Sequence, residues 1–123
     1  MPNRENFGSK KHLDEENDLV EHFKSLAAKY ALQRRPLRFY LNRLDMSLAE
    51  LTLLTKRYLG KTPKKYLNEI LATILLSEII RTELPFKTLS RKFRFGTSSS
   101  MANFVKTWSG MTPREFRAMN CLV

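Results

Sequence analysis

Apolar residues recur along most of the chain at the three- and four-residue intervals that are typical of amphipathic helices. The first such segment, over residues 14–31, places on one face Leu19, Val20, Phe23, Leu26, Ala27 and Tyr30. A shorter segment follows Pro36 and carries Leu37, Tyr40, Leu41 and Leu44. No stretch alternates between apolar and polar residues as a strand would. The pattern therefore predicts an all-α fold.

Local start and stop residues divide the middle of the chain into helices. Ser47 is a good N-cap with Glu50 three residues later, so a capping box is expected at the start of a helix over residues 47–59. Gly60 is suited to end that helix in a left-handed conformation. A new helix then starts at Thr62 and Pro63.

The helix over residues 63–82 carries apolar residues on more than one side. Such a helix is buried on two sides, so it is expected to link two subdomains. After Pro85 a short apolar stripe of Phe86, Leu89 and Phe93 is followed by a turn at residues 94–96. Thr97 or Ser98 then caps a helix over residues 98–109, Gly110 ends it, and Pro113 starts the last helix.

One phrase of the sequence occurs twice. Gly60-Lys61-Thr62-Pro63-Lys64-Lys65-Tyr66 reappears 50 residues later as Gly110-Met111-Thr112-Pro113-Arg114-Glu115-Phe116. A repeat of this length indicates one supersecondary unit used twice. We therefore expect a flexible arm over residues 1–12, a first unit over 13–62, the linker helix, and a second unit over 85–120, within one domain from residue 13 to 123.

The charge of the chain points to a polyanionic partner. The 123 residues carry a net charge of +10, of which residues 1–33 contribute −1 and residues 34–123 contribute +11. A basic field of that density attracts DNA, RNA or an anionic membrane surface. No apolar run is long enough to span a membrane, no secretory signal is visible, and the single Cys121 excludes an intramolecular disulfide. A cytoplasmic location is expected.

Each repeat, a short helix followed by a tight turn and a helix of about 12 residues, is a helix-turn-helix unit, whose second helix can enter the DNA major groove. Residues 37–117 resemble the DNA-binding domain of AraC/XylS-family transcription regulators. The resemblance is carried by Leu89-Ser90, Phe95, Lys106 and the segment Gly110-Met111-Thr112-Pro113-Arg114-Glu115-Phe116-Arg117, with further similarity at Phe39-Tyr40 and Leu44.

The resemblance implies seven helices, arranged as two helix-turn-helix subdomains joined by a long linker helix. It implies a transcription regulator whose partner is double-stranded DNA, with no catalytic residues, metal or cofactor. RNA polymerase is a further candidate partner. The family's usual N-terminal sensor or dimerisation domain is missing from this sequence, so the chain is either a stand-alone regulator or a fragment; we expect a fragment.

Several positions depart from the family pattern. Arg94 stands where a glycine usually precedes the aromatic residue of the second turn. Leu41 replaces a small residue, Leu53 a polar residue and Thr55 an apolar residue. The first recognition helix is therefore unusual.

Base contacts are expected from the N-terminal part of each recognition helix. In the second unit these residues are Ser98, Ser99, Ser100 and Asn103. Asn bonds well to adenine and Ser to several bases, although one of the serines is expected to cap the helix instead. In the first unit they are Leu48, Ala49, Thr52 and Leu53, where a core role for either leucine is an equal alternative. Glu50 either accepts from cytosine or completes the capping box.

Phosphate contacts are expected at helix N-termini and at nearby cations. The residues predicted for this role are Thr62, Lys64, Lys65, Lys56, Arg94, Lys106, Thr112 and Arg114. Arg38, Arg43, Arg91 and Lys92 are additional candidates.

Other functions are less well supported by the sequence. His12 and His22 have no cysteine partners and no set of carboxylates at ligand spacing, which argues against an enzyme. A protein-interaction module, with an acidic first helix as its docking element, and a non-specific nucleic-acid-binding module stay open as alternatives.

Overall fold

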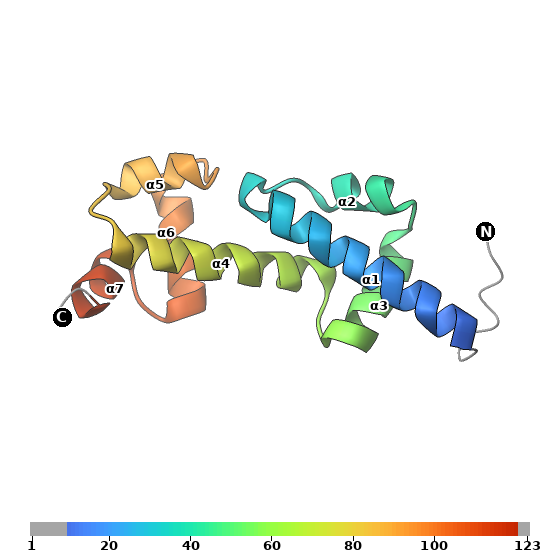
Figure 1. Cartoon of the computed structure of the whole chain (residues 1–123). Helices are drawn as coiled ribbons and strands as arrows, with labels where there is room; N and C mark the ends of the chain where they lie inside the picture. Colours follow the sequence, from blue (N-terminus) through green and yellow to red (C-terminus); the bar gives the residue numbers. More distant parts are fainter. Residues whose placement is uncertain (1–9, 121–123) are drawn as a thin grey trace. The chain divides into compact units, whose positions relative to one another are not determined.

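The computed structural model describes residues 10–120, with side chains from Leu13 onward. Within that range it contains seven α-helices, one short 3-10 turn at Ala31–Gln33, and no strand, as predicted (Figure 1). The helices are α1 (Lys10–Tyr30), α2 (Leu37–Leu44), α3 (Leu48–Leu59), α4 (Pro63–Arg81), α5 (Phe86–Lys92), α6 (Ser98–Ser109) and α7 (Pro113–Asn120). Residues 1–9 of the predicted arm and Cys121 lie outside the described residues.

The first helix begins earlier than the apolar pattern predicts. It starts at Lys10, so the last three residues of the expected arm, Lys10 to His12, are helical. Nothing in this polar stretch breaks a helix, and the apolar stripe that defined the predicted start begins only after it. The acidic residues of segment 14–21 consequently follow the first turn, and they do not lie at the positive end of the helix dipole.

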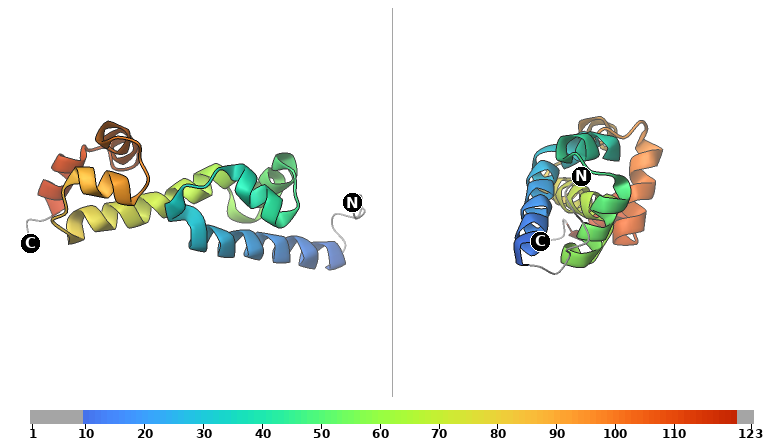
Figure 2. Two further views of the ribbon diagram at one scale, coloured as in Figure 1. Left: turned by 90° about the horizontal axis from the view of Figure 1, so that it is seen from above. Right: turned by 90° about the vertical axis from the view of Figure 1, so that its right-hand side faces the viewer.

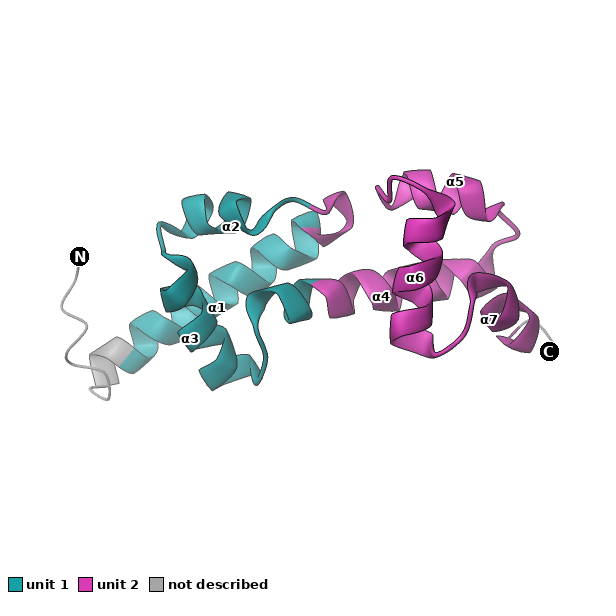
Figure 3. Ribbon diagram, turned by 180° about the vertical axis from the view of Figure 1, so that it is seen from behind, with its two compact units in different colours: residues 1–30, 35–67 teal, residues 31–34, 68–123 magenta. Residues whose placement is uncertain are grey.

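The chain divides into two compact units (Figure 3). Unit 1 comprises the residues up to Tyr30 and residues 35–67, and unit 2 comprises residues 31–34 and 68–123. The two units share α4, the helix predicted to link them, because its residues 63–67 belong to unit 1 and the rest belongs to unit 2.

The core of unit 1 forms where α1 packs against α2 and α3 (Figure 2). Its buried residues are Val20, Phe23, Leu26, Tyr40, Leu44, Met46, Leu51 and Leu54. Phe23 is at the centre, with its ring 5.8 Å from that of Tyr40 and 5.6 Å from that of Tyr66, at the start of α4. The first turn of α4 thus acts as a fourth helix of unit 1.

The core of unit 2 is formed by the later part of α4 together with α5 and α6. Its buried residues are Leu71, Leu75, Ile79, Leu89, Phe93, Phe95, Met101 and Val105. Phe116 of α7 packs against this cluster, as Tyr66 does in unit 1. The predicted core positions are confirmed in that Phe93 and Met101 are fully buried and Phe104 and Phe116 pack on them. Trp108 is half-buried beside Phe104.

The repeat extends further than the sequence phrase indicates. Three buried residues of α1 correspond to three of α4 at a spacing of 52 residues: Val20 to Ala72, Phe23 to Leu75 and Ala27 to Ile79. Both units therefore use a core helix, a helix-turn-helix pair and a closing helix. Helix α4 is the closing element of unit 1 and the core helix of unit 2.

Candidate nucleic-acid interface

Helix α3 is fixed at both ends by local hydrogen bonds. The Ser47 hydroxyl accepts from the Glu50 backbone N–H at 3.1 Å, and the Glu50 carboxylate accepts from the Ser47 N–H at 3.0 Å. Glu50 therefore completes the capping box, which settles the choice that the sequence left open. Gly60 ends the helix at φ +74°, where its N–H donates to the Lys56 carbonyl.

The outward face of α3 is largely apolar. Leu48 and Leu53 are 49% and 46% exposed, so both leucines lie outside the core. Ala49 and Lys56 are also exposed, and Thr52 is half-buried. The inward face consists of Leu51, Leu54 and Thr55, so the unusual polar residue at position 55 is buried, where its hydroxyl donates to the Thr52 carbonyl at 3.2 Å.

The start of α6 is polar and exposed. The Thr97 hydroxyl accepts from the Ser100 N–H at 3.0 Å, so Thr97 rather than a serine side chain caps the helix. Ser98, Ser99, Ser100 and Asn103 are all exposed, as is Lys106 farther along the helix. Met101 and Val105 are fully buried and hold α6 on the core.

The turns that precede α3 and α6 differ by one residue. Asp45 in the first turn and Arg94 in the second have positive φ angles of 52° and 61°. Equivalent backbone hydrogen bonds close the two turns, from Met46 to Leu41 and from Phe95 to Ser90. The spacing of these residues is 49, and it becomes 50 in the following helices because Gly96 is an additional residue.

The left-handed conformation explains the glycine that the family prefers at position 94. A side chain in this conformation costs on the order of 1–2 kcal/mol, and Arg94 bears that cost here. Its carbonyl accepts from the Arg34 guanidinium at 3.2 Å, and the same guanidinium lies 4.2 Å from the ring centre of Phe95. The Arg94 side chain itself is exposed.

The N-terminus of α4 combines free positive charge with a helix start. The Thr62 hydroxyl caps it by accepting from the Lys65 N–H at 3.2 Å. Lys64 and Lys65 are exposed, and the first turn contains no acidic residue. Such an end attracts anions through its N–H groups and the helix dipole.

The N-terminus of α7 has the same cap but carries an acidic residue, Glu115, in its first turn. The Thr112 hydroxyl accepts from the Glu115 N–H at 3.2 Å, and the Glu115 carboxylate accepts from the Thr112 N–H at 2.9 Å. Hydrogen bonds from the backbone and side chain of Thr112 to the carboxylate lower the pKa of Glu115, and Lys106 lowers it further. An N–H group that sequence reasoning assigned to phosphate is thus bonded to a carboxylate, although Arg114 beside it is exposed.

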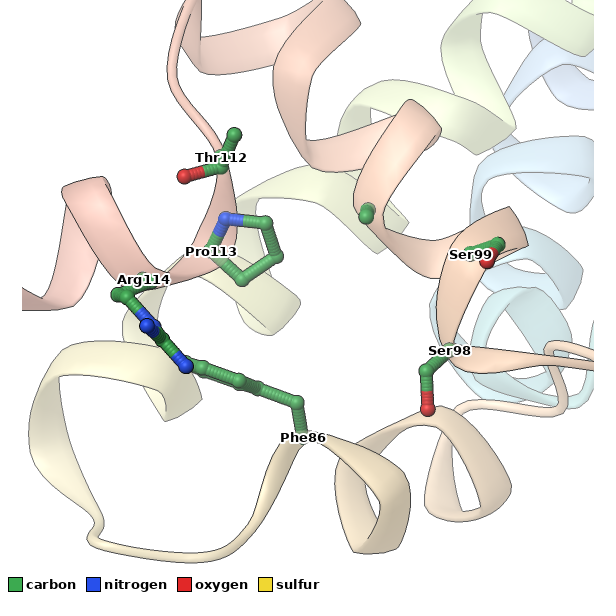
Figure 4. Close-up of a pocket in the computed structure, with 7 residues that line it drawn as sticks. Phe86, Ser98, Ser99, Thr112, Pro113 and Arg114 are labelled. Carbon is green, nitrogen blue, oxygen red and sulfur yellow. The ribbon is translucent and has the colours of Figure 1, made fainter.

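Four of the predicted site residues line one hollow in unit 2. It has a volume of about 400 Å³ and is bounded by the starts of α5, α6 and α7 (Figure 4). Ser98 and Ser99 come from the recognition helix, whereas Thr112 and Arg114 come from the repeated phrase. The structure therefore brings predicted base-reading and predicted phosphate-binding residues of unit 2 together.

A cationic surface of unit 1 was only partly anticipated from the sequence. The guanidinium carbons of Arg35 and Arg43 lie 4.2 and 4.7 Å from the ring centre of Phe39, and Arg43 also lies over Tyr30. Burial alone would raise the pKa of the Tyr30 phenol, but Lys29 and Arg43 together lower it. Arg43 was a candidate phosphate ligand, whereas Arg35 was missed. The spacing of Phe39 and Arg43 within α2 was the available signal for Arg43, whereas Arg35 precedes the N-cap Pro36 and lies outside the helix.

A second contact that the sequence did not reveal joins α1 to α3. Glu16 is only 2% exposed, and its carboxylate accepts from the Arg57 guanidinium at 3.0 Å and from the Tyr58 hydroxyl at 2.8 Å. Burial, and then the bond to Glu16, raise the pKa of Tyr58. The residue lies within an acidic run, but its position four residues before Val20 and seven before Phe23 on the apolar face of α1 was the available signal.

Two other kinds of site can be addressed for the described part of the chain. Between residues 13 and 120, no three His, Cys, Asp or Glu side chains gather as a metal ion would require. None of the helices built from those residues has the length and apolarity needed to cross a bilayer.

Comparison with known proteins agrees with this architecture. A family model described as a helix-turn-helix domain matches residues 40–119, which is more than half of the chain. The C-terminal domain of AraT, a response regulator from Geobacillus stearothermophilus, has a similar fold with a TM-score of 0.74. The two chains are 17% identical, and the match covers 85% of this chain and 87% of that one. No curated protein matches the chain.

Proposed function

Because the chain belongs to the AraC-type helix-turn-helix family of DNA-binding transcription regulators, we propose that it binds double-stranded DNA sequence-specifically through α3 and α6. The finer parts of this proposal are the two recognition helices and the division of roles among their residues. Binding to RNA polymerase and the existence of an upstream sensor or dimerisation domain remain predictions.

The observation that carries the proposal is the exposed polar start of α6. Thr97 supplies the cap, so the hydroxyl groups of Ser98, Ser99 and Ser100 are not needed for it. Asn103 is exposed one turn later and has the donor and acceptor that adenine recognition uses. A helix with this end in the major groove presents hydrogen-bonding groups to base edges.

Helix α3 supports a different kind of contact. Its exposed Leu48, Ala49 and Leu53 suit the methyl groups of thymine, with Thr52 as a polar reader among them. We therefore expect unit 1 to discriminate less sharply among sequences than unit 2.

Phosphate binding is proposed for the basic residues around these helices. The N-terminus of α4, with Lys64 and Lys65, is the strongest candidate because it has no acid in its first turn. Lys56, Arg94, Lys106 and Arg114 are exposed cations of the same two units. Two recognition helices in successive major-groove segments, about 34 Å apart, would give a binding site of about two helical turns.

Selection of bound duplexes from a random pool tests the proposal directly. We expect an enriched motif about two turns long, with stronger preference in the half that unit 2 reads. Titration of that motif at several salt concentrations should show affinity falling steeply as salt rises. Equal affinity for all sequences would leave only a non-specific nucleic-acid-binding module, and affinity independent of salt would contradict DNA binding by this basic surface.

Two substitutions separate base reading from phosphate binding. Asn103→Ala should relax the preference at the bases that α6 reads by about 1–3 kcal/mol. Lys65→Ala should weaken binding to all sequences alike, and it should reduce the slope of log affinity against log salt concentration by about one. The assignment is wrong if both variants lose affinity equally on every sequence.

A further inference from the structure

The buried carboxylate of Glu16 has no part in the DNA contacts proposed above, yet it bonds to the recognition helix of unit 1. Its side chain on α1 is 3% exposed, and both of its partners, Arg57 and Tyr58, lie in the last turn of α3. Arg57 donates to both carboxylate oxygens, at 3.0 and 3.3 Å, and the Tyr58 hydroxyl donates at 2.8 Å. Three hydrogen bonds therefore connect one carboxylate to one end of α3.

The other contacts of α3 with the core of unit 1 are mainly apolar. Leu51 and Leu54 are buried in the middle of the helix, and Tyr58 and Leu59 pack against the core near its end. Apolar contacts are non-directional, whereas hydrogen bonds to a charged group require a defined geometry. The contact with Glu16 thus adds a directional restraint between α1 and α3, and it lies about 15 Å along the helix from Leu48.

We propose that Glu16 is a positioning residue that sets the orientation of α3, and thereby which of its residues face the DNA bases. The inference rests on the proposed DNA binding, since it concerns how the reading face of α3 is presented. A small rotation or tilt of a rigid helix held at one end displaces the other end most, and the predicted readers Leu48 and Ala49 are at that other end.

The experiment compares Glu16→Gln with a matched control, Glu21→Gln. Both changes remove one negative charge from α1, but Glu21 is 61% exposed and pairs only with Lys24 on the surface. Glutamine at position 16 keeps the shape of the side chain and one acceptor oxygen. Arg57 is 40% exposed, so its charge stays hydrated and the variant is expected to fold. Thermal unfolding followed by circular dichroism checks this for each variant.

The first readout does not involve DNA. In Glu16→Gln, but not in Glu21→Gln, the backbone amide resonances of residues 48–52 should shift, although they lie at the far end of α3. Changes confined to the amides around residues 57 and 58 would overturn the proposal, because the carboxylate would then act only locally. This outcome is independent of whether the proposed DNA function is correct.

The second readout is base preference measured on the motif selected by the unaltered protein. Glu16→Gln should lower discrimination at the bases read by unit 1 about fivefold or more, with discrimination at those read by unit 2 changed less than twofold. Arg57→Gln should have the same effect, and the double variant should show no further loss, because the carboxylate acts through Arg57. Lower stability with unchanged base preference would overturn the proposal and leave Glu16 a purely structural role.

Discussion

Units 1 and 2 share one arrangement of helices but are held together by different polar contacts. In unit 1 a carboxylate of the core helix, Glu16, binds the end of the recognition helix. In unit 2 the core-helix carboxylate of Glu78 binds Lys92 of α5 instead, and Arg117 of α7 donates at 2.9 Å to the carbonyls of Ile79 and Leu84. The helix-turn-helix pair is thus the constant part, and the polar contacts that attach it to its neighbours differ between the two copies.

The exposed side chains of α3 and α6 also differ between the two units. Helix α3 presents exposed leucines and is hydrogen-bonded to Glu16 at its C-terminal end. Helix α6 instead presents exposed serines and an asparagine. Thymine methyl groups are recognised by shape, so an apolar face depends on its exact placement more than a face of hydrogen-bonding groups that rotate to meet a partner. The comparison suggests why the ion pair to the recognition helix belongs to unit 1.

The largest effect is expected from removing the contact that is particular to unit 2. Arg117→Ala should lower the free energy of unfolding by about 2–3 kcal/mol, because two hydrogen bonds from a charged group and the contact with the Phe86 ring, 4.4 Å away, are lost. Urea unfolding measures the change. Arg114→Ala, three residues earlier and exposed, is the control and should change stability by less than about 0.5 kcal/mol. Similar losses in both variants would contradict the role of Arg117.

Next in size are the two glycines that end the recognition helices, where the units should behave alike. Gly60→Ala places a Cβ on a residue with φ +74°, and Gly110→Ala places one on a residue with φ +77°. No neighbouring atom lies within 4 Å of either Cβ. Only backbone strain is added, so each should cost about 1–2 kcal/mol. A clear difference between the two losses in urea unfolding would mean that the helix ends are not equivalent.

The two turns should respond differently to glycine. Arg94→Gly removes the strain of an arginine in the left-handed conformation. Glycine also raises the conformational entropy of the unfolded chain, which offsets part of this effect. The free energy of unfolding should therefore rise by up to about 1 kcal/mol. Asp45→Gly should change stability little, because aspartate tolerates this conformation well. If Arg94→Gly lowers the urea midpoint instead, the arginine side chain must stabilise the turn in a way that outweighs the strain.

The smallest effect concerns the two helix N-termini in the repeated phrase. The pKa of Glu115 is lowered in the folded protein, so its contribution to stability is present above the ordinary glutamate range, about 4.3, and is lost as the pH falls through the lowered value. Glu115→Gln should therefore flatten the dependence of stability on pH between about 5 and 3.

The same substitution also removes negative charge from the start of α7, which then resembles the start of α4. DNA affinity at neutral pH should rise modestly, and by more at low salt than at high salt. An unchanged affinity at all salt concentrations would show that the α7 N-terminus does not approach phosphate.

Helix boundaries in this protein are predictable because they depend on neighbours in the sequence. The capping box of Ser47, the cap at Thr97 and the left-handed Gly60 and Gly110 all use hydrogen bonds spanning three or four residues. The start of α1 is the exception, since its first polar turn carries neither a cap signal nor an apolar stripe.

The contacts that distinguish the two units could not be predicted in this way. Glu16 meets Arg57 across 41 residues, and Arg117 meets Ile79 across 38. Glu16 differs from its exposed acidic neighbours in lying four and seven residues before Val20 and Phe23, on the apolar face of α1, but its distant partner Arg57 is not apparent from that spacing. Nor did the repeated phrase reveal the extra residue Gly96, because the phrase lies after the turn in which the spacing changes.

The cap at Thr97 has a consequence for how such a protein can change. Thr97 caps α6, and the buried Met101 and Val105 hold the helix on the core. The exposed side chains at positions 98–100 and 103 are therefore not needed for the cap or the core. Substitutions at these positions should therefore have little effect on stability. Under the proposed base-reading role, a library varied at these four positions would therefore change DNA sequence preference on an unchanged scaffold.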